Sequence, residues 1–253
     1  MYPVLFQLGP LVIHSYGVMI ALAVLLGVFV GLREGRRLGL EEGVLLDLAF
    51  YGTLAGVIGA RLWHAATDWP HYVGRPWEIL FFWQPGLAIQ GVVVAAIATT
   101  VWLARRRRIS FWQLADAGAP GLVLGQAIGR IGCFLAGCCY GVECDLPWAV
   151  PLAGAHRHPT QIYEFSVDLA IFAVLWTIRR RKPFEGFVFL VYAVMWSSMR
   201  VLLDFLRADT PIVAYGMRWA QLAGLTGVAI GLLIIGVRLW LEHGQGAFQR
   251  SSS

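Results

Sequence analysis

One short segment, residues 129–141, gathers many of the residues in this chain that could do chemistry. It contains Arg130, three of the four cysteines and four glycines, at the end of an apolar stretch. An arginine beside a hydrocarbon layer is costly to keep there, so it usually has a function. Glycines let a ligand or another backbone come close because they lack a Cβ atom. We therefore expect this segment to form the floor of a site for an anionic lipid.

Two further arginines outside the basic clusters, Arg61 and Arg200, are expected at the same depth, with Arg207 one or two helical turns further out. A guanidinium presents a planar fork of donors to phosphate oxygens and stays charged when partly dehydrated. A lipid phosphodiester would supply the missing counter-charge. The alternative is a set of simple ion pairs. Arg61 would then pair with Asp68, and Arg200 with Asp204 one helical turn later.

The chain has four cysteines, and they allow two interpretations. They are Cys133, Cys138, Cys139 and Cys144. Disulfides persist near an oxidising outer face, and each of the two adjacent cysteines pairs more easily with one of the others than with its neighbour. A disulfide across the loop after the fourth span, or buried small residues, is the first expectation. Reactive thiols or metal ligands are the alternative. His156 and His158 lie nearby, but the spacing matches no standard zinc pattern, so no metal or cofactor is predicted.

Composition predicts the elements that must position these residues. Of the 253 residues, 58% are hydrophobic and only 14% are charged, which excludes an ordinary soluble domain. We expect an all-α membrane protein with residues 1–253 in one polytopic transmembrane domain. Seven apolar runs are near the length needed to cross a bilayer, at about 13–32, 44–66, 87–104, 117–135, 162–178, 184–206 and 217–241.

The fourth span is the least regular of the seven. It is rich in glycine and interrupted by Pro120. Its Arg130 end is therefore expected to be a broken helix, which is tolerated only where it lines a cavity filled by protein or water.

Basic residues predict the orientation of the spans. They cluster after the first, third and fifth spans: Arg33, Arg36 and Arg37, then 105–108, then 179–182. The other side carries few, so the positive-inside rule places the N-terminus outside and the C-terminus in the cytoplasm. Because topology explains these clusters, no nucleic-acid partner is expected. Aromatic residues of the outward loops form an expected interfacial belt: Trp69, His71, Tyr72, Trp77, Trp83 and Trp148.

A run of polar residues, 158–164, opens the fifth span. Thr160 or a neighbour is expected to cap the helix, with Glu164 in the first turn favoured by the helix dipole. Capping leaves His158, Gln161 and Tyr163 unexplained, and these side chains suit an interfacial binding site.

Several segments resemble the prolipoprotein diacylglyceryl transferases of bacteria over most of the chain. The resemblance covers the opening Pro3–Phe6 with 9–10 and 14–17, the glycine-rich 85–91, the approach 110–120, Gly129–Gly132 and the 158–164 block. Arg200, Asp204 and Arg207 match an arginine, acid, arginine pattern in the sixth span. Seven spans with the N-terminus outside is also that family's architecture.

The resemblance implies transfer of a diacylglyceryl group from phosphatidylglycerol to the thiol of a lipobox cysteine in a prolipoprotein. Glycerol phosphate would be released at the outer face of the bacterial inner membrane. The partners would be phosphatidylglycerol, membrane lipid and the prolipoprotein signal peptide. The implied catalytic residues are Tyr16, Gln90, Arg130 and Arg200. The implied substrate-binding residues are Arg61, Gly86, Gly91, Cys133, Cys138, His158, Gln161, Tyr163, Glu164, Asp204 and Arg207.

Three positions depart from the family's pattern. Gln90 stands where the family has a histidine, Cys133 where it has asparagine and Cys138 where it has glutamate. Gln90 cannot act as a base, so His14 or His158 would have to do so. Two alternatives follow, a catalytically silent or re-purposed lipid-binding relative and a transferase with a different acceptor. A channel or ion transporter is disfavoured because the arginines would repel cations.

Overall fold

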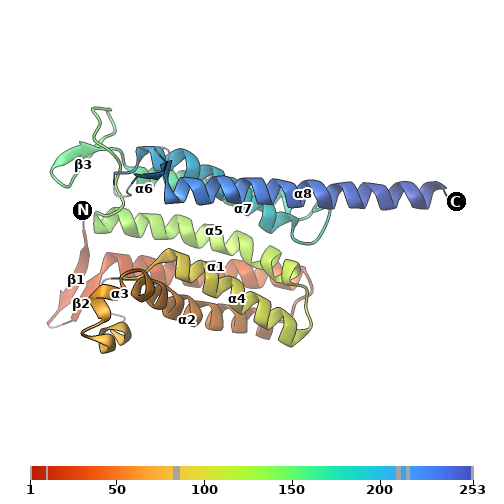
Figure 1. Ribbon diagram of the computed structural model, residues 1–253, viewed down its shortest axis with the longest axis horizontal. Helices are drawn as coiled ribbons and strands as arrows, with labels where there is room; N and C mark the ends of the chain where they lie inside the picture. The colour runs from red at the N-terminus through yellow and green to blue at the C-terminus, as the bar shows by residue number, and fades with distance from the viewer. Residues whose placement is uncertain (1, 10, 82–85, 209–211, 215–216, 252–253) are drawn as a thin grey trace. The chain divides into compact units, whose positions relative to one another are not determined.

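The computed structural model describes residues 2–9, 11–81, 86–208, 212–214 and 217–251. Trp83 of the expected aromatic belt, and Pro10 and Pro85 of the quoted motifs, lie outside these ranges. Among the described residues, seven helices are long and apolar enough to cross a membrane. They are α1 (Ser15–Arg37), α2 (Glu42–Thr67), α4 (Ile89–Arg107), α5 (Phe111–Ala136), α6 (Thr160–Ile178), α7 (Phe187–Leu203) and α8 (Trp219–Ser251), shown in Figure 1.

Each of the seven predicted spans overlaps one of these helices, so the seven-helix prediction is confirmed. Short elements occupy the connections. They are α3 (Trp69–Tyr72), η1 (Pro76–Leu80) and η2 (Asp204–Leu206), and the antiparallel hairpins β1–β2 (Val4–Leu8, Leu11–His14), β3–β4 (Val150–Leu152, Ala155–Arg157) and β5–β6 (Ile212–Ala214, Met217–Arg218).

The chain forms two compact units, Leu32–Ala117 and the remainder, Met1–Gly31 with Gly118–Ser253. The smaller unit holds α2, α4 and the adjoining ends of α1 and α5. Its apolar core includes the fully buried Leu103 and Leu114. Helices α2 and α4 approach closely at Gly59 and Gly91, where a Cβ atom on either glycine would meet the other's carbonyl oxygen. Small residues at such crossings are typical of helix packing in membranes.

The larger unit packs α5, α6 and α7 around a core that includes Val123, Ile171 and Val188. Helix α7 also runs along α8, where Gly224 and Gly231 leave room for Val201 and Val194 (Figure 1). The large apolar side chains on the outside of these helices, such as Leu233, are exposed in the structure, as expected of surfaces that face lipid.

Helix α5 is continuous through Pro120, so the expected break at its Arg130 end is wrong. Its glycines serve close packing on α1 instead. A Cβ atom on Gly121 would meet the carbonyl oxygen of Gly27, and one on Gly132 would lie 3.0 Å from the Cβ of Met19. The glycine-rich pattern of α5 therefore reflects close helix packing and not an irregular backbone.

Candidate functional site

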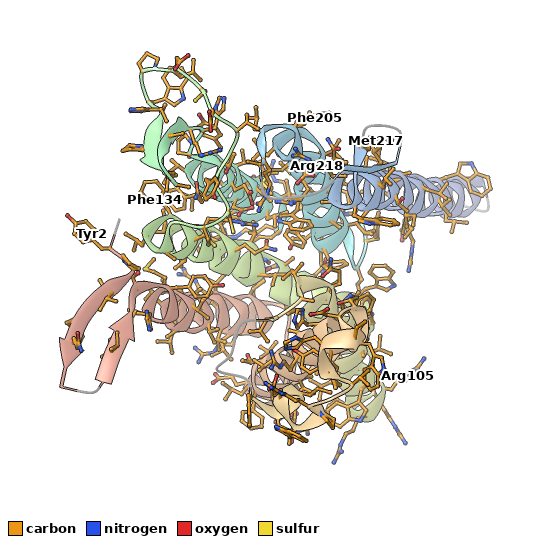
Figure 2. All side chains as sticks on the ribbon, turned by 60° about the vertical axis from the view of Figure 1, so that its left-hand side comes forward. Tyr2, Arg105, Phe134, Phe205, Met217 and Arg218 are labelled. Carbon is orange, nitrogen blue, oxygen red and sulfur yellow. The ribbon has the colours of Figure 1, made fainter. Side chains whose placement is uncertain are left out.

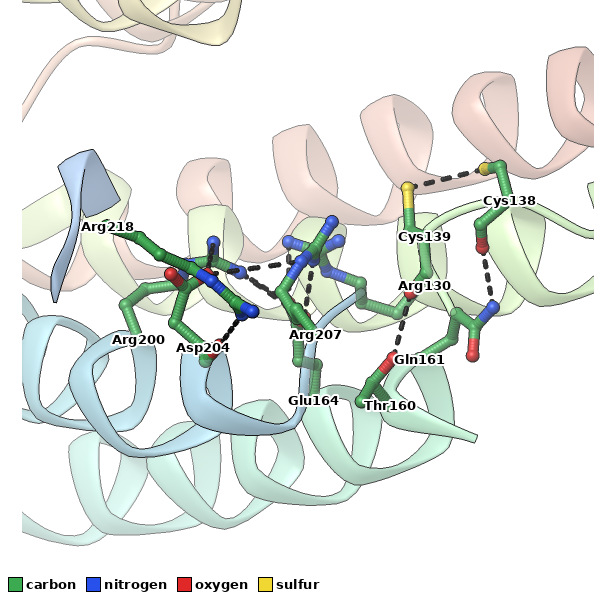
Figure 3. Close-up of polar contacts among 10 residues, drawn as sticks. All are labelled: Arg130, Cys138, Cys139, Thr160, Gln161, Glu164, Arg200, Asp204, Arg207 and Arg218. Carbon is green, nitrogen blue, oxygen red and sulfur yellow. Dashed lines mark hydrogen bonds and ion pairs between the residues drawn. The ribbon is translucent and has the colours of Figure 1, made fainter. Parts of the chain in front are cut away.

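A buried carboxylate binds three arginines from separate segments of the larger unit. Glu164 of α6 has no exposed side-chain surface, and its Oε2 lies 2.6 Å from Nη2 of Arg130 on α5. Its Oε1 lies 3.3 Å from Nη1 of Arg200 on α7 and 3.0 Å from Nη1 of Arg207, which follows η2. Figure 3 shows the three guanidinium groups converging on this side chain. We call Glu164 and these three arginines the arginine cluster.

Asp204 extends the arginine cluster toward the start of α8. Its buried carboxylate accepts a hydrogen bond of 3.1 Å from Nη2 of Arg200, so the pair expected one helical turn apart is confirmed. Arg218 donates from Nη1 to the backbone carbonyl of Asp204. Figure 2 shows Arg218 in the same region as Phe205, which belongs to η2. A fourth guanidinium, which the sequence did not single out, thus lies beside the cluster.

Asp168 is a buried acid that sequence reasoning missed. It lies one helical turn after Glu164 on α6, and its side chain is fully buried. Within the described part of the chain, neither of its carboxylate oxygens has a hydrogen-bond partner. The signal was present, because an acidic residue inside an apolar span is by default a candidate functional residue.

Charge and exposure together make this region suited to an anion. The four arginines outnumber the carboxylates of Glu164, Asp204 and Asp168 even if all three are ionised. Arg130 is the most accessible member, with 22% of its side chain exposed, against 13% for Arg200 and 7% for Arg207. An incoming phosphate would therefore meet Arg130 first, while Glu164 fixes the guanidinium from behind.

The positions of the cysteines follow from the way α5 ends. The N–H of Cys138 donates to the carbonyl of Cys133 at 3.1 Å, and that of Gly137 to Phe134 at 3.1 Å. With Gly137 at a φ of 75°, this is the Schellman motif, which brings the residue after the glycine back over the last turn of the helix. Cys138 therefore returns to Cys133, and Cys139 follows it. We call residues 133–139 the cysteine turn.

Two side chains of α6 hold the cysteine turn in place. Thr160 donates from Oγ1 to the carbonyl of Cys139 at 2.8 Å, and Gln161 from Nε2 to that of Cys138 at 2.5 Å. Both side chains are fully buried. These bonds stabilise Cys139 in the left-handed region, φ 63°, a conformation that costs a residue with a Cβ atom about 1–2 kcal/mol.

The expected capping by Thr160 is wrong. The cap position of α6 is Pro159, no side chain caps the helix, and Glu164 lies beyond the first turn. The hydroxyl of Thr160 is instead directed at the cysteine turn, and the carboxylate of Glu164 at the arginines. The polar residues of the 158–164 block therefore hold other segments in place.

All four cysteines are free thiols, so the disulfide favoured by the sequence is not formed. Instead Cys139 Sγ lies 3.4 Å from Cys138 Sγ. Hydrogen bonds from the thiols of Cys133 and Cys138 lower the pKa of Cys139, and the positive charges of Arg207 and Arg130 act in the same direction. A thiolate is therefore favoured beside the arginine cluster.

Tyr163 and His158 form a second polar group at the start of α6. Trp148 donates from Nε1 to the hydroxyl of Tyr163 at 2.7 Å, and that hydroxyl lies 3.2 Å from Nδ1 of His158. The indole N–H can only donate, so the tyrosine oxygen accepts from Trp148, whereas the direction of its bond with His158 depends on the imidazole tautomer. Tyr16 packs against α5, where a Cβ on Gly132 would lie 3.3 Å from its ring.

Four predicted site residues belong to the smaller unit: Arg61, Gly86, Gln90 and Gly91. The fully buried Arg61 donates to the backbone carbonyls of Glu78, Ile79 and Gly86, at 2.6, 3.1 and 3.1 Å. It therefore fastens the segment between α2 and α4, a structural task that sequence reasoning missed. Gly91 serves the contact with α2, and Gln90 is exposed in the first turn of α4.

Comparisons with known proteins identify the family of this chain. The family model described as prolipoprotein diacylglyceryl transferase matches residues 3–237. The chain belongs to this family. Proteins named phosphatidylglycerol–prolipoprotein diacylglyceryl transferase from Synechococcus elongatus and Nostoc are each 36% identical to it over 91% of its length, covering 85% and 87% of their own. The Bacillus velezensis protein of the same name is 32% identical over 92% of the chain and 90% of its own length.

Membership in the prolipoprotein diacylglyceryl transferase family confirms the resemblance drawn from the motifs. The family match contains six of the seven long helices and α8 as far as residue 237, and therefore includes both the arginine cluster and the cysteine turn. The protein is a multi-pass membrane member of a transferase family, so the alternative of a catalytically silent relative is not favoured.

Proposed function

We propose that the protein transfers a diacylglyceryl group from phosphatidylglycerol to the lipobox cysteine of a prolipoprotein. The observation that carries the proposal is the arginine cluster, in which three arginines meet the buried Glu164 where α5, α6 and the end of α7 come together, with Arg218 beside it. The positive excess suits one phosphate headgroup, and the family match supplies the reaction class.

The chemistry requires a leaving group and a nucleophile to be stabilised together. The acceptor thiolate attacks the terminal glycerol carbon of the diacylglyceryl group. A C–S bond forms while the C–O bond to phosphate breaks, and glycerol phosphate leaves with the bonding electrons. Arg130 and Arg200 neutralise the charge that grows on the departing phosphate, which is the kind of stabilisation that lowers a barrier most.

Glu164 positions the arginines for this task, and Asp204 and Arg207 support it. Because Glu164 is fully buried and bound to three guanidinium groups, it holds them close despite their mutual repulsion. The region around the arginine cluster is lined or supported by four further predicted residues: Tyr16, Cys133, Cys138 and Gln161. Arg61, Gly86, Gln90 and Gly91 remain predicted contributors from the smaller unit.

For the proton of the acceptor thiol, we propose His158 in place of a base at position 90. Nδ1 of His158 lies 3.2 Å from the hydroxyl of Tyr163, and in the tautomer protonated at Nε2 it accepts from that hydroxyl, so that a proton taken up by the tyrosine oxygen can pass to the imidazole. His14, the other candidate, lies exposed on β2.

We further propose that residues 1–253 act as one transmembrane domain in the bacterial inner membrane. The N-terminus would be outside and the site would open to the outer face, because the positive-inside rule places the basic residues at the ends of α1 and α4 and after α6 in the cytoplasm.

The test is intact-mass analysis of a synthetic lipobox peptide after incubation with the purified protein and phosphatidylglycerol micelles. A diacylglyceryl adduct is expected, with loss of at least a hundredfold in rate for Arg130→Ala, the cost typical of removing one transition-state donor. Arg105→Ala is the matched control, because Arg105 projects from the end of α4 in the smaller unit (Figure 2).

Three outcomes would overturn parts of the proposal. A missing adduct together with missing glycerol phosphate would overturn the reaction. Glycerol phosphate without a modified peptide would leave the donor correct and the acceptor wrong. Equal rates for the wild type, Arg130→Ala and Arg105→Ala would overturn the assignment of the site.

A further inference from the structure

Three sulfur atoms converge at the cysteine turn. The Sγ atoms of Cys133, Cys138 and Cys139 all lie within 4.8 Å of one another. Cys144, in the loop beyond, is not a member of this group. A single ion with Zn–S bonds of about 2.3 Å needs its sulfurs about 3.8 Å apart in tetrahedral geometry. The thiols therefore need to move by no more than about 1 Å to share one ion.

We propose that Cys133, Cys138 and Cys139 bind one thiophilic d¹⁰ cation, Zn²⁺, and that its fourth position receives the thiolate of the acceptor. The first part stands on the cysteine turn alone. The second part rests on the proposed transfer reaction and deepens it, because it names how the acceptor becomes a nucleophile in a chain where Gln90 cannot act as a base.

The turn is built to keep three sulfurs together without a disulfide. The Schellman bonds fix Cys138 over Cys133, and the buried Thr160 and Gln161 fix the carbonyls of Cys139 and Cys138. Cys139 is held in the left-handed region, a strained conformation of the sort that is concentrated at functional sites. A backbone fixed in this way preorganises the three sulfur ligands for the ion.

The charge of the surroundings suits such a site. Three thiolates around a divalent ion carry a net negative charge, and Arg130 of the arginine cluster stands three residues before Cys133 on α5. Binding releases the remaining thiol protons to water and involves no oxidation. Soft thiolate ligands select Zn²⁺ and similar ions over Mg²⁺ or Ca²⁺.

Three protein ligands leave one position of a tetrahedral ion open, as in zinc sites that act on a bound group. A thiol that coordinates zinc loses its proton outright. The acceptor thiol would give that proton to His158, the base proposed above, and the zinc would hold the thiolate while the C–S bond forms and the C–O bond to phosphate breaks beside Arg130. The cysteine turn at the end of α5 and Arg130 in its last turns would thus hold the two reacting partners close together.

Metal binding is tested on the reduced full-length protein in detergent after treatment with a chelator. Cd²⁺ serves as the probe, because its thiolate complexes show an ultraviolet charge-transfer band. We expect one equivalent of Cd²⁺ per chain, a band lost in Cys138→Ser and Cys139→Ser, and a band unchanged in the matched control Cys144→Ser. No band in the wild type, or equal bands in all variants, overturns the site.

A second measurement needs no variant. Zn²⁺ should protect the three cysteines of the turn from alkylation in the wild-type protein, as located by peptide mapping, while Cys144 stays reactive. Equal labelling of all four cysteines with and without Zn²⁺ overturns the site even if the serine variants fail to fold.

The role in transfer is tested separately with the lipobox peptide. Chelation should lower the transfer rate at least tenfold, and one equivalent of Zn²⁺ should restore it. An unchanged rate after chelation, with the Cd²⁺ band present, overturns the acceptor step and leaves the metal site. No transfer with or without Zn²⁺ overturns the proposed function and the acceptor step together, again without affecting the metal result.

Discussion

Replacing Glu164 by glutamine tests how much a buried counter-charge contributes to stability, compared with a charge in an exposed ion pair. The amide keeps the shape of the side chain but removes the charge that holds three guanidinium groups at 2.6, 3.0 and 3.3 Å. Removing one partner of a buried ion pair typically costs about 3–5 kcal/mol, because the other charge remains buried. We expect Glu164→Gln to lower the free energy of unfolding by about this amount, and not by three times as much, because the three arginines also repel one another.

The matched control is Glu143→Gln. Glu143 also pairs with an arginine, Arg157, at 2.8 Å, but 67% of its side chain is exposed. Exposed pairs contribute about 0–1 kcal/mol. Unfolding of both variants in mixed micelles, followed by circular dichroism, compares the same chemical change at 0% and 67% exposure.

The transfer rate gives the second readout. Without Glu164 the arginines should separate, and a displacement of about 1 Å at a reacting centre can lower the rate about a hundredfold. A stability loss below about 1 kcal/mol, or one no larger than that of Glu143→Gln, would refute the reasoning that Glu164 is the counter-charge of the cluster.

Three further predictions concern packing and positioning. Gly121→Ala should destabilise the protein by about 1–3 kcal/mol, because the added Cβ overpacks against α1. The control Gly118→Ala should change stability little, because the space around its Cβ is open. Equal unfolding curves for the two variants would contradict this. Gln161→Leu should lower the free energy of unfolding by about 1–3 kcal/mol and speed amide hydrogen exchange in residues 137–141, because the carbonyl of Cys138 loses its hydrogen-bond donor. Unchanged exchange would show that Gln161 does not hold the cysteine turn in place. Gln90→His should leave the peptide-transfer rate equal or higher; a loss above tenfold would show that the amide itself is required.

The helices were predictable from sequence because hydropathy and length decide which segments can cross a membrane. The pair Arg200–Asp204 was predictable too, since both residues lie on one helix and the distance follows from helical geometry. The contacts of Glu164 were not, because they join α6 to α5 and to the residues after η2, and local patterns carry no information on which helices meet.

The cysteine turn is an intermediate case. Glycine after the last turn of a helix is a known signal for the motif, and Gly137 stands four residues after Cys133. That spacing predicts a contact between Cys133 and Cys138, but only if the end of the helix is placed correctly. The expectation of a broken helix near Arg130 obscured it, because α5 in fact continues as a regular helix to Ala136.

The arginine cluster also constrains how the protein enters the membrane during synthesis. Arg130 lies on α5, whereas its partner Glu164 lies on α6, which leaves the ribosome later. An unpaired arginine costs about 2.5–3.5 kcal/mol on insertion scales at the centre of a membrane helix. Arg130 lies nearer the end of α5, so its cost is smaller, and lateral release of α5 into lipid becomes easier once α6 has arrived. Arg200 on α7 is neutralised in the same way by a helix already present. The ion pairs that shape the binding site thus also favour an order in which its helices leave the translocation channel.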